Sequence, residues 1–246
     1  MHRTRTGRTA FAALALIAVA AITAASAGAT ATAPTISVRI EGTTSTLRLP
    51  TSVTLKPGSV NSDGVAGHSC SSLTAAGAIE LATHGSWKGT WSKSLRGYFI
   101  SAVDGLALPA TGAEYWAFWV NDAPASQGIC GYKPKPGDSI LFFPDCYGKK
   151  CPPNDGVLAV KAPATVTAGS PTTVTVTAYS DAAGKPSPKA GATVTGAGTS
   201  AKTAAGGAAR ITFTKPGRFW LEVSAPHTTR TEARICVRTA TSNPCG

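Results

Sequence analysis

Apolar and polar positions alternate along most of the chain, and this pattern predicts strands. In residues 35–42 the apolar side chains recur at every second position, Ile36, Val38 and Ile40, which is the period of a strand with one buried face. Further strands are predicted where the alternation continues or where a short apolar run lies between turn residues. These segments are 45–55, 98–108, 115–120 and 139–143.

Residues 71–85 change to a helical period. The apolar stripe of this segment comprises Leu73, Ala76, Ile79 and Leu81. Ser71 or Ser72 is the expected N-cap, and Gly85 is the expected end. Strands followed by one helix and then more strands predict an α+β amino-terminal domain, a mixed sheet with one main helix, over residues 35–150.

The second half has an all-β pattern. After a linker at 151–156, rich in turn-forming residues, threonine and valine alternate and Gly or Pro turns recur. Strands are predicted in 156–169, 172–179, 190–196, 208–225 and 232–240. This texture is typical of an immunoglobulin-like β-sandwich, expected over residues 157–246.

The predicted strand "YWAFWV" at 115–120 is apolar on both faces. Side chains on a strand alternate between faces, so Trp116, Phe118 and Val120 point one way. Their bulk favours packing against the helix. Tyr115 and Trp119 point the other way and remain for loops, a neighbouring domain or a ligand, because each carries a polar tip suited to half-exposed contacts.

The amino terminus indicates export. Basic residues in 1–8 precede an apolar run at 11–25 and a small-residue cleavage pattern ending at Ala27. Residues 1–27 are therefore a predicted signal peptide, and 28–34 a spacer, since the apolar run is short for a membrane span. An uncleaved anchor is the alternative. No membrane span is expected after cleavage, and the protein is expected to be secreted and extracellular, with cell-surface association as a further option.

Charge narrows the expected partners. The chain holds 23 basic and 12 acidic residues, and loss of three arginines with the signal peptide leaves a net charge of +8. The basic residues are scattered, which argues against nucleic acid and is compatible with a solvated surface or an anionic envelope polymer. The expected partner is an envelope polymer, a protein or a small amphipathic ligand, and the oligomeric state is left open.

Six cysteines in an exported chain predict disulfides. Several pairings are possible. Cys236 and Cys245 bracket a short terminal loop and are expected to pair, Cys146 and Cys151 can close another short loop, and Cys70 would then pair with Cys130.

Catalytic and metal motifs are weak. "GHSCS" at 67–71 resembles a nucleophile elbow around Ser69, but its last glycine is missing and the preceding segment is turn-like. The only histidines further along are His84 and His227. The cysteines lack the close spacing of zinc ligands. We therefore expect no enzyme activity, no cofactor and no metal, with a secreted serine hydrolase using Ser69 as the weakest alternative.

Residues 114–143 carry a family resemblance. An aromatic strand, then "VN", a glycine and "GD" before an apolar strand resembles the transcobalamin-like C-terminal domain family, and "ISVRIEG" and "GTWSK" upstream fit it too. The matching positions are Trp116, Phe118, Trp119, Val120, Asn121, Gly128, Tyr132, Gly137, Asp138 and Ile140. In vitamin B12 carriers such a domain closes over the corrinoid, while a helical barrel, for which this chain has no counterpart, holds the other side.

The second half, with "AGATVTG" before the hairpin turn "KPG", resembles bacterial immunoglobulin-like domains of the adhesin and invasin type. Together these features favour an exported, non-catalytic binding or adhesion protein. The alternative is capture of a small ligand, with a cobalamin-like corrinoid as the named candidate. Its expected contacts are Tyr115, Trp119, Asn121, Gln127 and Tyr132.

Overall fold

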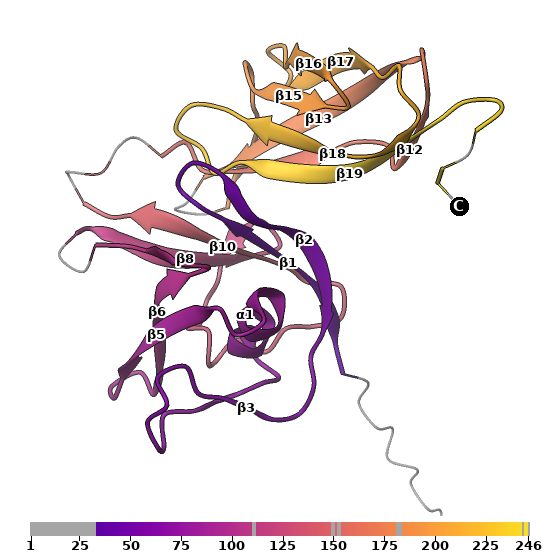
Figure 1. Ribbon diagram of the computed structural model, residues 1–246. Helices are drawn as coiled ribbons and strands as arrows, with labels where there is room; N and C mark the ends of the chain where they lie inside the picture. The colour runs from indigo at the N-terminus through magenta and orange to yellow at the C-terminus, as the bar shows by residue number, and fades with distance from the viewer. Residues whose placement is uncertain are drawn as a thin grey trace, which may run out of the picture. The chain divides into compact units, whose positions relative to one another are not determined.

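The computed structural model describes residues 33–109, 112–148, 151, 154–180, 184–242 and 244–245. The predicted signal peptide and nearly all of the spacer lie outside these residues. Ala33–Gly246 form one compact unit, in which strands dominate and one helix occurs among the described residues (Figure 1). The part of the chain that the structure describes contains no helix long and apolar enough to cross a membrane.

The largest sheet of the first half has the strand order β2-β1-β10-β8-β9. Its strands are β1 (Thr35–Glu41), β2 (Thr46–Thr54), β8 (Glu114–Val120), β9 (Ala123–Pro124) and β10 (Ser139–Cys146). β1 and β10 are parallel, and the other pairs are antiparallel. Two smaller sheets consist of β5 (Trp87–Ser92), β6 (Gly97–Val103) and β7 (Leu106–Ala107), and of β3 (Ser59–Val60) with β4 (Cys70–Ser71).

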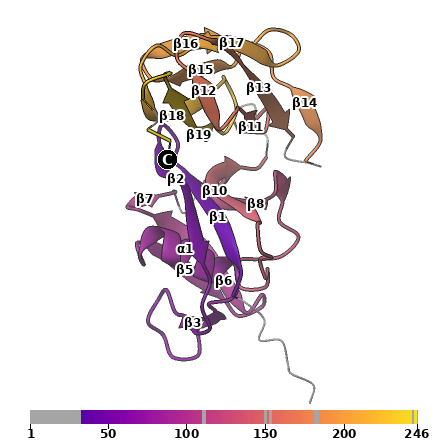
Figure 2. The same cartoon turned by 90° about the vertical axis from the view of Figure 1, so that its right-hand side faces the viewer.

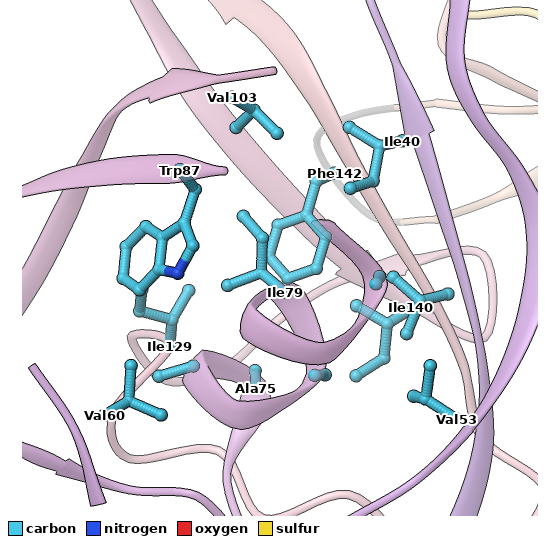
Figure 3. Close-up of a cluster of buried hydrophobic side chains, with 14 of the residues drawn as sticks. Ile40, Val53, Val60, Ala75, Ile79, Trp87, Val103, Ile129, Ile140 and Phe142 are labelled. Carbon is cyan, nitrogen blue, oxygen red and sulfur yellow. The ribbon is translucent and has the colours of Figure 1, made fainter. Parts of the chain in front are cut away.

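The predicted helix is α1, Ala75–Thr83, and it packs into the core of the first half. Figure 3 shows Ile79 of α1 directed toward Phe142 of β10, and both side chains are fully buried. The expected N-cap was wrong, since Thr74 and neither Ser71 nor Ser72 caps the helix. At the other end His84, in the left-handed conformation with φ 53°, is the C-cap, and Gly85, with φ 80°, follows it directly.

The second half contains two sheets that share one core. One sheet has the order β11-β13-β14, with β17 also paired to β13, and the other has the order β12-β19-β18-β15-β16. Buried residues from both sheets form a single cluster between them, as in a β-sandwich (Figures 1 and 2). The strands are β11 (Val157–Lys161), β12 (Thr165–Thr167), β13 (Pro171–Tyr179), β14 (Pro186–Pro188), β15 (Thr193–Gly196), β16 (Thr199–Lys202), β17 (Ala208–Thr212), β18 (Gly217–Ser224) and β19 (Thr231–Arg238).

The β-rich, sandwich-type character predicted for the chain is therefore confirmed. The division into an α+β domain at 35–150 and an immunoglobulin-like domain at 157–246 stays a prediction. All three expected disulfides are present, namely Cys70–Cys130, Cys146–Cys151 and Cys236–Cys245. These crosslinks fit the predicted extracellular location.

The two faces of β8 divide as the sequence predicts. Trp116 and Val120 are buried in the cluster that contains α1, and Phe118 packs against it. The opposite face contributes Ala117 and Trp119 to a separate cluster. That cluster also contains Leu141, Phe143 and Val157, with Tyr179 packed against it. Trp119 is 3% exposed and meets Phe143 edge to face, so its indole is part of the hydrophobic interior.

A buried group of charged side chains joins β1 and β2 to the start of β19. Arg39 Nη1 lies 3.3 Å from Glu41 Oε1 and 3.5 Å from Glu232 Oε2. Thr46 Oγ1 contacts both carboxylates, at 2.9 Å from Glu41 and 2.5 Å from Glu232. The guanidinium of Arg230 is 3.5 Å from Glu41. Burial, together with the neighbouring Glu232 carboxylate, outweighs Arg39 and raises the pKa of Glu41 to about 8.

Candidate ligand-binding site

The aromatic strand β8 is fully paired on one side only. Its whole length, from Glu114 to Val120, pairs with β10. On the other side β9 pairs only with Trp119 and Val120, and one further backbone hydrogen bond runs from the N–H of Ala125 to the carbonyl of Phe118. Most of this edge of β8 is therefore not covered by a neighbouring strand.

A largely apolar pocket of about 460 Å³ lies along this edge. Three segments build it: β6 with the turn before it, β8, and the loop that carries Cys130. The lining residues are Leu95, Gly97, Tyr98, Phe99, Ile100, Tyr115, Trp116, Ala117, Phe118, Trp119, Pro124, Ala125, Gly128, Ile129, Cys130 and Gly131. The Cys70–Cys130 disulfide ties this loop to β4, and the N–H of Tyr98 donates to Cys130 Sγ at 3.4 Å.

Two side chains on the rim are exposed despite their size. Leu95 is 66% and Phe99 is 58% exposed, and both line the pocket. Leaving such side chains in water forgoes about 1.5–3 kcal/mol each relative to full burial. An apolar group bound in the pocket could recover part of this free energy.

The pocket wall contains one unused hydrogen-bond donor. Trp116 is 7% exposed, and its indole N–H has no acceptor among the described residues. Buried donors are normally paired. The hydroxyl of Tyr98, another lining residue, is already engaged, since it donates to the carbonyl of His68 at 2.6 Å and lies near Asp63 at 3.0 Å.

Of the five residues predicted from the sequence to contact a ligand, two line this pocket and three lie elsewhere. Tyr115, which is 41% exposed, and Trp119 line the pocket. Gln127 is exposed and is not among the lining residues. Asn121 and Tyr132 lie instead in a hydrogen-bonded network around Asp138. Phe99 of β6 and Leu95 in the turn before it were missed, because the sequence of one segment does not show whether another segment covers its apolar side chains.

The network around Asp138 fixes the turns at the end of the sheet. The carboxylate accepts hydrogen bonds from the Asn121 amide and the Tyr132 hydroxyl, both at 2.9 Å, and from the N–H of Lys135 at 2.8 Å. Burial alone would raise the pKa of Asp138, but these donors outweigh it and lower the pKa. Burial and the adjacent carboxylate raise the pKa of Tyr132 to about 12. This geometry favours a structural role for the side chains of Asn121 and Tyr132.

We expect Tyr132→Phe to lower the free energy of unfolding by about 1–2 kcal/mol, because it removes a hydrogen bond to a carboxylate. Denaturant titration would measure this loss. Tyr115→Phe is the matched control, since its hydroxyl donates to Asp145 at 3.0 Å in an exposed position, and it should cost much less. A larger effect of Tyr132→Phe on ligand affinity than on stability would contradict the structural role.

Ser69 lies in the loop outside this pocket, next to the pair His68 and Asp63. His68 Nδ1 is 2.8 Å from Asp63 Oδ2, and the imidazole stacks on Trp91 with ring centroids 4.9 Å apart. These contacts hold His68 between Asp63 of its own loop and Trp91 of β5. Within the described residues no group of three or more His, Cys, Asp or Glu side chains is placed to hold a metal ion.

Comparison with known proteins gives a limited match. Residues 75–143 match the model of a domain of unknown function, DUF4430. No curated protein matches the chain. The resemblance to the transcobalamin-like C-terminal domain and the adhesin or invasin type of the second half stay predictions.

Three solved structures show low similarity. The chain is similar to a "putative metal binding protein" from Ruminococcus gnavus, with 11% identity, a TM-score of 0.33, and coverage of 47% of this chain and 99% of that one. It is also similar to haptocorrin in complex with Cbi, at 18% identity and a TM-score of 0.35, with coverage of 46% and 25%. For a β-glycosidase from Bacteroides vulgatus the identity is 13%, the TM-score 0.27, and the coverage 51% and 21%.

Proposed function

We propose that this chain is an exported, non-catalytic binding protein that captures an amphipathic ligand in the pocket beside β8. The observation that carries the proposal is the pocket itself, which combines apolar walls, two exposed apolar rim residues and a buried indole N–H without an acceptor. Its volume lies within the range of small-molecule sites. Such sites are usually lined by many apolar groups and a few polar ones, as this pocket is. The ligand would place its apolar part between β6 and β8 and an acceptor near Trp116.

The test uses anilinonaphthalene sulfonate, an apolar fluorescent anion, as a probe for the purified protein. We expect saturable binding that weakens about tenfold or more in Leu95→Ala/Phe99→Ala, because the rim contributes apolar area to the bound state. The matched control is Leu49→Ala/Val65→Ala, which truncates two exposed apolar residues outside the pocket. Equal binding by both double variants would overturn the assignment of the site.

A corrinoid is the ligand that the sequence resemblance suggests, and competition decides it. Cyanocobalamin that displaces the probe from the wild-type protein, but does not bind Leu95→Ala/Phe99→Ala, would support corrinoid capture. Failure to displace the probe at high micromolar concentration would remove corrinoids from the candidates and leave the pocket assignment intact. Adhesion to an envelope polymer would use the same site if the polymer displays such a group.

A further inference from the structure

The uncovered edge of β8 presents backbone hydrogen-bonding groups as well as apolar side chains. In an antiparallel ladder, the N–H and C=O groups of successive residues point alternately to the two neighbouring strands. The carbonyl of Phe118 accepts from Ala125 N at 3.3 Å, on the β9 side. The carbonyl of Ala113 accepts from Tyr147 N at 3.0 Å, on the β10 side. The backbone N–H and C=O groups of the even-numbered residues of β8 therefore point away from β10.

Glu114 and Trp116 consequently direct their N–H and C=O groups toward the uncovered edge. Among the described residues these groups have no backbone partner, because the last backbone hydrogen bond on this side is the one from Ala125 to Phe118. The same edge borders the pocket, whose opposite wall is β6 with the exposed Phe99. A ligand in the pocket thus lies beside donors and acceptors that repeat at every second residue, about 7 Å apart.

This repeat selects one kind of ligand. A small apolar molecule can fill the pocket but cannot satisfy two donor–acceptor pairs that are spaced as in a strand. An extended peptide carries the complementary groups at the same repeat, and its alternate side chains point to one face. The exposed Glu114 carboxylate at the end of the edge favours a basic residue in the segment of peptide that lies beside it.

We propose that the natural occupant of the pocket is an extended peptide segment that pairs with the Glu114–Trp116 edge of β8 as an added strand. It runs antiparallel to β8, as β9 does, so its carboxyl-terminal end lies beside Glu114. Alternate apolar side chains enter the pocket against Phe99 and Leu95. This inference rests on the proposed binding function of the same pocket and names the class of its ligand.

The first test uses acetyl-Val-Thr-Val-Thr-Val-Lys-amide and two N-methylated isomers, one methylated on the nitrogens of the first two valines and one on the nitrogens of the two threonines. The alternation of valine and threonine fixes the register, so only one set of nitrogens faces β8. We expect one isomer to bind like the parent peptide and the other about tenfold or more weakly, as measured by displacement of anilinonaphthalene sulfonate. Isomers that bind alike, or a parent peptide that does not bind, would overturn strand pairing.

The second test changes the protein. Glu114→Pro removes a backbone donor from the uncovered edge, a position where proline is tolerated, whereas Glu114→Gln keeps the donor and removes only the charge. We expect the peptide to bind Glu114→Pro more weakly than Glu114→Gln, while both variants keep the wild-type affinity for anilinonaphthalene sulfonate. Equal peptide affinities would overturn the pairing. If anilinonaphthalene sulfonate did not bind the wild-type protein, the pocket assignment itself would fail. Failure of the pocket and failure of strand pairing are therefore distinguishable.

Discussion

Replacing Cys70 and Cys130 together by alanine should lower the free energy of unfolding by about 4 kcal/mol and remove ligand binding at the β8 pocket. The two cysteines are 60 residues apart in sequence, and in the chain-entropy model a crosslink over so long a segment strongly restricts the unfolded chain. The effect on binding follows from position, since Cys130 lies in the pocket wall and its sulfur accepts from the N–H of Tyr98 in β6.

Cys236→Ala/Cys245→Ala is the matched control for this prediction. Those cysteines are 9 residues apart, so the same model gives a smaller loss, about 2.5 kcal/mol, and neither residue lines the pocket. Denaturant titration under non-reducing conditions measures the stabilities, and probe fluorescence below the unfolding transition measures binding. Should both pairs reduce probe binding to the same extent, the disulfide would not be what holds the pocket wall.

The sequence predicted the positions of the strands and disulfides better than it predicted which side chains are buried and what they contact. Alternation located β1, and short apolar runs between turns located β8 and β10. Close cysteine spacing indicated two of the disulfides and left Cys70 and Cys130 as the third pair. These features depend on local periodicity and on compartment. β5 was missed because Gly89 interrupts a short segment that lacks a clean apolar alternation. Leu81 was expected in the buried stripe of α1 but is 38% exposed, because it lies on the small part of this otherwise buried helix that faces solvent.

β1 shows most clearly why a local pattern is insufficient. Its alternation predicts that Ile36, Val38 and Ile40 are buried, as they are, and leaves Arg39 and Glu41 for the solvent face. Both are in fact buried, at 8% and 1% exposure. Arg230, which contacts both side chains just before β19, is about 190 positions away in the sequence, and no periodicity within β1 contains that information. The pocket also depends on contacts between distant parts of the chain. It is built by three segments, and the sequence of each segment alone does not indicate a pocket.

The buried charged group gives the other large expected effect, a loss of stability as the pH rises. The pKa of Glu41 is about 8 in the folded protein, against 4.5 for an unperturbed glutamate. The folded state therefore binds this proton more tightly than the unfolded state does. The resulting stabilisation is fully present below pH 4.5 and is lost as the pH rises toward 8. We expect the free energy of unfolding to fall by a few kcal/mol across this window.

Glu41→Gln should remove this pH dependence, because the amide resembles the protonated carboxyl in shape and carries no charge to desolvate. At pH 8 the variant should be more stable than the wild type, and near pH 5 the two should differ little. Glu222→Gln is the matched control, since Glu222 is exposed and lies directly opposite Glu232 across the β18–β19 pair. It should keep the wild-type slope. A slope that persists in Glu41→Gln would show that another group binds the proton.

Arg39→Met tests the same group from the cationic side. Removing one partner of a buried ionic cluster leaves the remaining charges uncompensated, which costs about 3–5 kcal/mol. Here the two carboxylates of Glu41 and Glu232 would remain. Among the described residues, Arg230 would then be the one arginine that still forms an ion pair with this group, through Glu41. The loss should be larger at pH 8 than at pH 5, because protonation of Glu41 relieves the repulsion at the lower pH. Combining Arg39→Met with Glu41→Gln should restore part of the stability at pH 8. If the double variant is no more stable than Arg39→Met, the cost comes from lost packing of the arginine side chain and not from unpaired charge.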